Sequence, residues 1–132
     1  MIFLDANFLI YLNLAVEEVK NYYLNLLSTE SLALDLLVVD EVIYVSKKKY
    51  NIKFEDTIRF LDEIVLPYVT VLPLTSKEYE VAKEFMLKYS LYPSDSLHIA
   101  VMVNNSIKKI VSEDSDFDKI KEIERIWISM ES

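Results

Sequence analysis

The chain opens with a short apolar run that ends in an acid. Residues 1–4 are Met, Ile, Phe and Leu, and Asp5 follows them directly. A continuous run of this length predicts a buried strand with the carboxylate at its C-terminal tip. Apolar and β-branched runs predict further short strands over residues 68–72, 107–112 and 123–128.

Between these runs, apolar residues recur at the three- and four-residue spacing of amphipathic helices. The predicted helices span residues 6–14, 16–27, 36–50, 54–66, 76–89 and 93–104. Strands and helices therefore alternate, and no two-residue hairpin signal joins any two strands. This pattern predicts a parallel α/β sheet with helices on both faces, folded as a single domain over residues 1–132.

Polar residues and prolines mark the predicted helix ends. Asp35 is suited to cap the third helix, and Thr75 or Ser76 to cap the fifth. Pro67 ends the fourth helix, while Pro93 fits the first turn of the last one.

Composition excludes several kinds of site. The chain has no cysteine, which excludes disulfides and thiolate zinc sites. The single histidine excludes multi-histidine metal sites, and the lack of glycine excludes a dinucleotide-binding fingerprint or a P-loop. Turns must use Asn, Asp, Ser and Pro, with Asn best suited to left-handed positions. A metal would bind carboxylates, which favours hard cations such as Mg²⁺ or Mn²⁺.

The formal net charge is −8. Proteins that bind nucleic acid through bulk charge are normally basic, so either nucleic acid is not the partner or a bound metal supplies the positive charge. The first strand begins at Met1, so no signal peptide is expected. The longest apolar stretch, residues 32–45, contains three acids and is too short to span a bilayer. We therefore expect a cytoplasmic protein with no membrane partner.

Several acids stand where strands end or helices begin. Asp5 follows the first strand, and Asp114 and Asp116 follow the strand over residues 107–112. Asp95 lies in the first turn of a helix. Parallel strands end at one edge of the sheet, and helix N-termini point to that edge, so these acids are expected to lie together.

Two further acids lie inside the apolar half of the helix over residues 36–50. The helical neighbours of Glu41 are apolar or aromatic, and a carboxylate there is costly unless it is paired or metal-bound. Asp40 is a rival that periodicity does not separate from Glu41. Two unit charges about 4 Å apart repel by about 4 kcal/mol at an effective dielectric of about 20. Several acids in one pocket therefore need protonation, an arginine or a divalent cation.

Each of these residues also has a purely structural interpretation. Asp5 alone fits a turn, Asp95 alone fits an ordinary helix first turn, and the acids after residue 112 fit Asx-turns. His98 lies one helical turn after Asp95 among apolar residues. We interpret it as a packed helix histidine rather than a metal ligand.

Four motifs, taken in order, carry a resemblance to the PIN-domain nucleases. They are Leu4-Asp5-Ala6-Asn7-Phe8-Leu9-Ile10-Tyr11, Glu41-Val42, Ser94-Asp95-Ser96-Leu97-His98-Ile99-Ala100 and Val111-Ser112-Glu113-Asp114-Ser115-Asp116-Phe117-Asp118. Each motif alone is weak, but four in order with an acid at each expected place are specific. The chain most resembles the VapC-type toxin ribonucleases of prokaryotic toxin–antitoxin pairs, over its whole length.

The resemblance implies a three-layer α/β/α sandwich around a mostly parallel sheet of four to five short strands. It implies a Mg²⁺- or Mn²⁺-dependent endoribonuclease that acts on RNA, is silenced by a small antitoxin protein and forms a homodimer. The residues that match the family's acidic ligands are Asp5, Glu41, Asp95 and Asp114, with Asp116 matching a further acid of many members. Asn7 and Ser112 match its polar positioning residues, with serine where the family usually has threonine. The match also favours Glu41 over Asp40.

Other functions fit parts of the sequence less well or equally well. A PIN nuclease that processes RNA without a toxic role fits the same residues, and a neighbouring antitoxin gene would separate the two. A non-catalytic PIN-like interaction module would be expected to lose acids, and this chain loses none. A receiver-like phosphotransfer domain is disfavoured, because it needs adjacent acids before the nucleophile strand and a late lysine in a set place. A dehalogenase-like domain is disfavoured, because it needs an acid where this chain has Asn7.

Overall fold

The computed structural model describes residues 1–130 and contains one sheet of five parallel strands. β1 (Ile2–Leu4) is the central strand, between β2 (Leu32–Leu34) and β4 (Lys109–Val111). β3 (Thr70–Val71) and β5 (Glu124–Ile126) form the two edges. The order β3-β2-β1-β4-β5 therefore puts the first strand of the chain in the middle, with a strand end on either side of its C-terminal tip.

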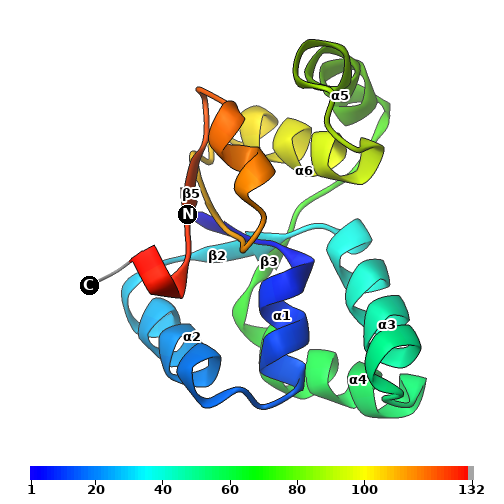
Figure 1. Ribbon diagram of the computed structural model, residues 1–132, viewed down its shortest axis with the longest axis vertical. Helices are drawn as coiled ribbons and strands as arrows, with labels where there is room; N and C mark the ends of the chain where they lie inside the picture. Colours follow the sequence, from blue (N-terminus) through cyan, green and yellow to red (C-terminus); the bar gives the residue numbers. More distant parts are fainter. Residues whose placement is uncertain (131–132) are drawn as a thin grey trace.

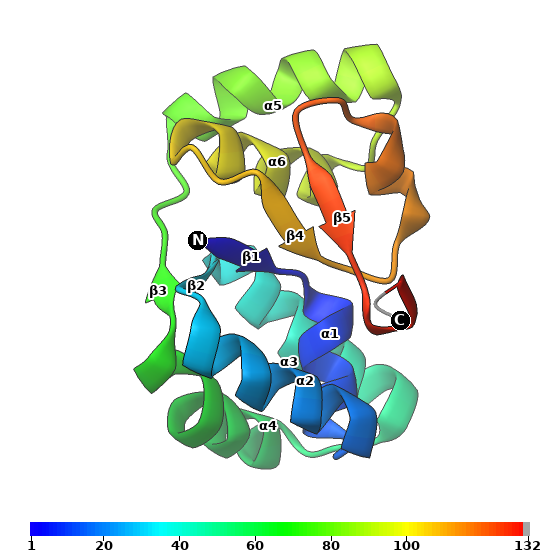
Figure 2. The same ribbon diagram turned by 90° about the vertical axis from the view of Figure 1, so that its left-hand side faces the viewer.

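Helices cover both faces of this sheet (Figure 1, Figure 2). One face is covered by α1 (Ala6–Asn13), α2 (Glu17–Thr29), α3 (Leu36–Tyr50) and α4 (Phe54–Phe60). The other face is covered by α6 (Pro93–Asn104), and α5 (Ser76–Tyr89) packs on the outside of α6. The predicted three-layer arrangement is confirmed. Among residues 1–130, no helix combines the length and apolarity needed to cross a bilayer.

The central strands are buried on both sides. All three residues of β1 and all three of β2 are buried, as expected for parallel strands with helices on both faces. Phe3 and Leu4 are fully buried, and α1 adds Phe8 and Leu9 to the same core. Each such side chain contributes about 1.5–3 kcal/mol by leaving water. This packing fixes the end of β1 and hence the position of Asp5.

The predicted helix caps are present. Asp35 caps α3, where its Oδ1 accepts a 3.1 Å hydrogen bond from the Val38 N–H. Thr75 and Glu78 form a capping box at the start of α5, which confirms Thr75 rather than Ser76 as the cap. Such a cap satisfies N–H groups that have no partner within the helix.

Within residues 1–130, four residues take the left-handed backbone conformation that glycine would normally fill. They are Ala15, Asn51, Ser90 and Ser106, with φ between 55° and 59°. Asn51 ends α3, and Ser90 ends α5 in the same way. Asparagine, the residue expected at such positions, occupies one of the four. Serine or alanine occupies the other three, where the left-handed conformation has a steric cost.

β2 was not predicted from the sequence. Its residues belong to the apolar stretch that was interpreted as the approach to the third helix. Three residues without a β-branched side chain carry little strand signal of their own. Pairing with β1 and β3 on either side makes this segment a strand.

The helix predicted over residues 54–66 is not continuous. α4 stops at Phe60, and a π-helical turn (Leu61–Val65) and a 3₁₀ turn (Leu66–Tyr68) follow. Pro67 has no N–H to donate back to the preceding turn, which breaks the α-helical pattern. The Tyr23 hydroxyl instead donates a 2.6 Å hydrogen bond to the Ile64 carbonyl, one of the acceptors of this irregular segment.

Candidate functional site

Asp5 lies at the C-terminal tip of β1 and is 4% exposed. Its Oδ1 accepts a 2.8 Å hydrogen bond from the Ala6 N–H and caps α1. Its Oδ2 accepts from the Ser112 hydroxyl at 2.7 Å and from the Asn7 amide at 3.3 Å. Both oxygens are therefore held, and the carboxylate has a single orientation at the edge of the sheet.

Ser112 and Asn7 join the ends of β1 and β4. The Ser112 Oγ accepts hydrogen bonds from the Asn7 amide at 3.2 Å and from the Asp114 N–H at 3.0 Å. The side-chain Oδ1 of Asn7 accepts a hydrogen bond from the Glu113 N–H at 3.2 Å. These contacts position the loop that carries Asp114 against the carboxylate of Asp5.

Glu41 comes from α3 and is half-buried, whereas its neighbour Asp40 is exposed. Burial raises the pKa of Glu41 above its ordinary value, and the charge of Asp5 raises it further. Glu41 thus shares an electrostatic environment with Asp5. Glu41 is thus the more buried of the two acids that periodicity left open, and its choice over Asp40 stays a prediction.

Asp95 lies in the first turn of α6 and is partly buried. Burial raises its pKa to about 7, and the charges of Asp5, Asp114 and Glu41 add to the shift, while His98 opposes it. Among the described residues, no side chain or backbone group donates a hydrogen bond to the Asp95 carboxylate. Its charge is therefore poorly compensated without a further ligand.

Four of the predicted acids act on one another. We call Asp5, Glu41, Asp95 and Asp114 the acid cluster, because the charges of the other three all raise the pKa of Asp95. The Asp116 carboxylate is half-exposed and lies 3.8 Å from the Lys119 ammonium, and only its backbone N–H contacts Asp114, at 2.9 Å. The charges of three predicted acids thus act on Asp95, and Asp116 is not among them.

No lysine or arginine within residues 1–130 forms an ion pair with the acid cluster. Arg125 contacts the end of β4 beside these acids, where it donates a 3.1 Å hydrogen bond to the Ser112 backbone carbonyl. Its guanidinium is already paired with Asp118, through contacts of 2.9 and 3.0 Å. The acid cluster is consequently rich in oxygen donors and short of positive charge, which fits a divalent cation.

His98 and Asp35 form a buried pair beneath these acids. Both side chains are fully buried, and Nδ1 of His98 lies 2.7 Å from Oδ2 of Asp35. Burial lowers the pKa of His98, but the hydrogen bond to Asp35 and the charges of Asp35, Asp5 and Asp95 outweigh it and raise the pKa overall. The interpretation of His98 as a buried helix residue agrees with its burial. The contact with Asp35 was missed, because no local pattern links residues 63 positions apart.

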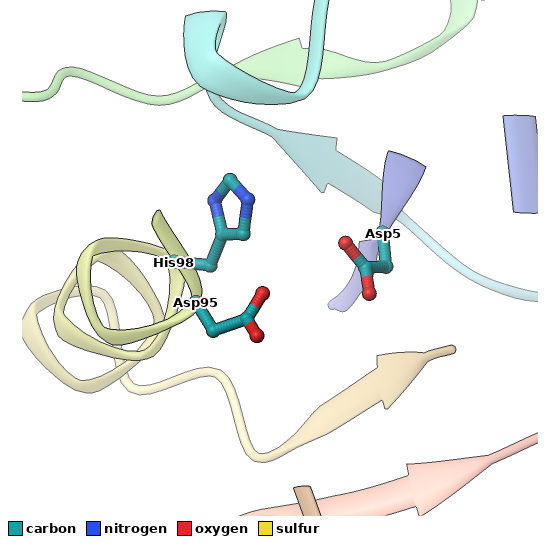
Figure 3. A group of neighbouring side chains, drawn as sticks. All are labelled: Asp5, Asp95 and His98. Atoms are coloured by element: carbon teal, nitrogen blue, oxygen red, sulfur yellow. The ribbon is translucent and has the colours of Figure 1, made fainter. Parts of the chain in front are cut away.

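His98 also belongs to a group of potential ligand atoms. One atom each from Asp5, Asp95 and His98 lies within 4.8 Å of the others. Figure 3 shows Asp95 and His98 extending from α6 toward Asp5 at the end of β1. This group of potential ligand atoms therefore includes a ring nitrogen as well as carboxylate oxygens, which the sequence did not predict.

Comparison with known proteins decides the family. The model of the PIN domain matches residues 2–123 of the chain. The chain belongs to the PIN-domain family. The resemblance inferred from the four motifs is thereby confirmed.

Relatives of this PIN domain include named ribonucleases. The chain is 30% identical to ribonuclease VapC2 of Methanocaldococcus jannaschii, across 96% of this chain and 93% of that protein. It is 32% identical to ribonuclease VapC13 of Mycobacterium tuberculosis, across 96% and 99%. Its fold resembles the structure of VapBC2 from Rickettsia felis bound to a promoter DNA fragment, with a TM-score of 0.77, 20% identity and coverage of 96% and 98%.

Proposed function

We propose that this PIN domain is a divalent-metal-dependent endoribonuclease and the toxin of a VapBC-type toxin–antitoxin pair. The observation that carries the proposal is the acid cluster, which gathers four carboxylates at one sheet edge without an ion-pair partner among residues 1–130. The names of the relatives from Methanocaldococcus jannaschii and Mycobacterium tuberculosis support ribonuclease activity. We further propose that residues 1–132 act as one domain in the cytoplasm.

Asp5, Glu41, Asp95 and Asp114 are the residues proposed to hold Mg²⁺ or Mn²⁺. When bound, the cation supplies positive charge to a phosphate oxygen and lowers the pKa of an attacking water. Asp116 is kept as an outer acid, since its carboxylate lies beside Lys119. Ser112 and Asn7 are positioning residues that hold the Asp5 carboxylate in place.

The net charge of −8 agrees with this role for a metal. An acidic protein repels the RNA backbone, and a cluster of like charges adds to that repulsion. A divalent cation in the acid cluster would reverse the local sign of the charge and give the phosphate a binding site. The chain itself then needs no basic patch to act on RNA.

We also propose a small antitoxin as the partner that silences the site. Beside it lies a cavity of about 160 Å³ whose lining combines apolar Ile10 and Val45 with polar Asn7, Lys49 and Glu113. An amphipathic helix bound over this cavity could direct an arginine into the acid cluster, where its planar guanidinium pairs with carboxylates. The similar Rickettsia felis chain was solved as VapBC2. A homodimer is proposed from the family resemblance.

The direct test incubates the protein with mixed structured RNAs, with Mn²⁺ or with excess EDTA, and maps the cut ends. We expect cleavage only with Mn²⁺, and products that carry a 5′-phosphate and a 3′-hydroxyl. Cyclic phosphate ends would point to attack by the ribose hydroxyl and would contradict the proposed role of water. A pull-down from native lysate should recover a small partner, and its absence would favour an RNA-processing nuclease over a toxin.

A further inference from the structure

His98 is fixed from one side by a buried carboxylate. Its Nδ1 lies 2.7 Å from Oδ2 of Asp35, and a carboxylate oxygen accepts, so Nδ1–H is the donor. The other oxygen of Asp35 accepts from the Val38 N–H at the start of α3. Because both oxygens of Asp35 have partners, the imidazole has one tautomer and one orientation.

The second ring nitrogen of His98 has no partner. Within residues 1–130, Nε2 is buried from solvent and forms no hydrogen bond. The hydrogen bond at Nδ1 leaves the lone pair of Nε2 available in the neutral ring. A buried polar atom without a partner destabilises a fold, so this arrangement indicates a ligand that fills the position.

The acids beside His98 show where such a ligand would lie. Asp5 and Asp95 each place a carboxylate oxygen within 4.8 Å of a His98 nitrogen and of one another. Nδ1 is engaged by Asp35, so Nε2 is the nitrogen that remains for this group. In Figure 3 the imidazole lies above Asp95, with one nitrogen on the side of the ring that faces Asp5.

We propose that Nε2 of His98 is a direct ligand of the cation held by Asp5 and Asp95, and that Asp35 is the residue that orients it. A histidine that binds a metal commonly donates its other N–H to a carboxylate, which fixes the ring and raises its basicity. The inference rests on the proposed metal site and names one of its ligands. A mixed nitrogen and oxygen donor set favours Mn²⁺ over Mg²⁺ more than carboxylates alone do.

In a competing account, His98 is a buried positive charge that balances the nearby carboxylates and does not bind the ion. Its ring centroid lies 5.4 Å from that of Phe3, so packing alone accounts for part of its environment. The two accounts differ in one observable, which is whether a bound ion is bonded to a histidine nitrogen.

The single histidine of the chain makes that observable specific. Untagged protein, loaded with less than one equivalent of Mn²⁺, is measured by electron spin-echo envelope modulation with natural and with ¹⁵N-labelled histidine. We expect a nitrogen coupling that changes with the isotope, which assigns the bonded nitrogen to His98. A bound Mn²⁺ whose signal is the same in both samples would overturn the inference and leave the proposed nuclease intact.

Variants provide an independent measurement. His98→Gln and Asp35→Asn should each weaken Mn²⁺ binding by calorimetry, about 10- to 100-fold, and His98→Gln should weaken Mg²⁺ binding less. Met102→Leu, a volume-conserving change of a fully buried residue on α6, is the matched control and should bind Mn²⁺ as the wild type does. Wild-type Mn²⁺ affinity in a folded His98→Gln would contradict the inference. Should that variant fail to fold, the isotope experiment on the wild type still decides.

The two proposals fail in different ways. Loss of the isotope effect with Mn²⁺ still bound removes His98 from the ligands only. RNA cleavage in excess EDTA, with no Mn²⁺ bound to the protein, would instead refute the metal-dependent function and the histidine ligand together.

Discussion

Ser112, at the end of β4, donates a 2.7 Å hydrogen bond to the Asp5 carboxylate at the end of β1, although 107 residues separate the two in the sequence. Parallel pairing of Leu4 with Val111 brings these strand ends together. The contact is fully buried at Ser112, so water does not replace it easily. A central feature of the site thus follows directly from the strand order.

Replacing Ser112 with alanine should impair the site more than the fold. The change leaves Asp5 without its closest donor, and we expect the free energy of unfolding to fall by about 1–3 kcal/mol. Cleavage of RNA should fall about 10- to 100-fold, as is typical when a group that positions a metal ligand is lost. Ser112→Thr keeps the hydroxyl and is the control; if both variants cleave at the wild-type rate, the hydroxyl has no positioning role.

The adjacent acids of α3 offer a matched pair. Glu41 is half-buried beside the charge of Asp5, whereas Asp40 is exposed. Glu41→Gln should abolish detectable cleavage in Mn²⁺, while Asp40→Asn should leave the rate within about twofold of wild type, as expected for a surface change. Equal losses in the two variants would show that net charge, and not position in the acid cluster, controls the activity.

A second matched pair concerns the loop after β4. The charge of Asp114 raises the pKa of Asp95, whereas the Asp116 carboxylate is half-exposed and lies near Lys119. Asp114→Asn should therefore weaken Mn²⁺ binding in calorimetry far more than Asp116→Asn does. A larger loss from Asp116→Asn would make Asp116 the direct ligand and Asp114 the outer acid.

The metal-free protein should become less stable as the pH rises. Asp95 has a pKa of about 7 in the folded protein, well above about 3.9 in an unfolded chain. Between these values the folded state binds more protons, so the free energy of unfolding falls with increasing pH. The facing charges are Asp5, Glu41, Asp114 and His98, and the raised pKa of His98 acts in the same direction.

Thermal unfolding in EDTA, measured from pH 5.5 to pH 8, checks this expectation. The melting temperature of the wild type should fall across the range, and that of Asp95→Asn should fall less and lie above the wild type at pH 8. The Asp95 carboxylate has no hydrogen-bond donor among the described residues, so the variant loses charge without losing a hydrogen bond. If the melting temperatures of the two proteins changed with pH in the same way, the pKa of Asp95 would not be raised in the folded protein.

The sequence predicted the features that depend on local pattern. The run into Asp5, the cap at Asp35 and the proline at the start of α6 each specify an element end by themselves. For α5 the sequence left Thr75 and Ser76 as alternative caps, and the structure shows Thr75. The alternation of strands and helices was sufficient to predict the parallel sheet. The family resemblance, rather than periodicity, separated Glu41 from Asp40.

The features that escaped prediction depend on distant partners. β2 is too short to show a strand pattern and forms because β1 and β3 pair with it. The pairing of His98 with Asp35 needs two helices to meet, and each residue alone had an adequate local explanation. The hydrogen bond from Tyr23 to the Ile64 carbonyl, in the π-helical turn after Phe60, likewise joins two segments that no local pattern links.

The central claim is that the acid cluster binds the cation on which RNA cleavage depends. Its most direct test measures, in the same buffer, the Mn²⁺ dissociation constant by calorimetry and the Mn²⁺ concentration that gives half-maximal cleavage. The two values should agree for the wild type, and in Asp95→Asn both should rise together, by about 100-fold or more, because a direct ligand matters at least as much as an outer one. Cleavage in excess EDTA, or an Asp95→Asn variant with wild-type values for both, would contradict the claim.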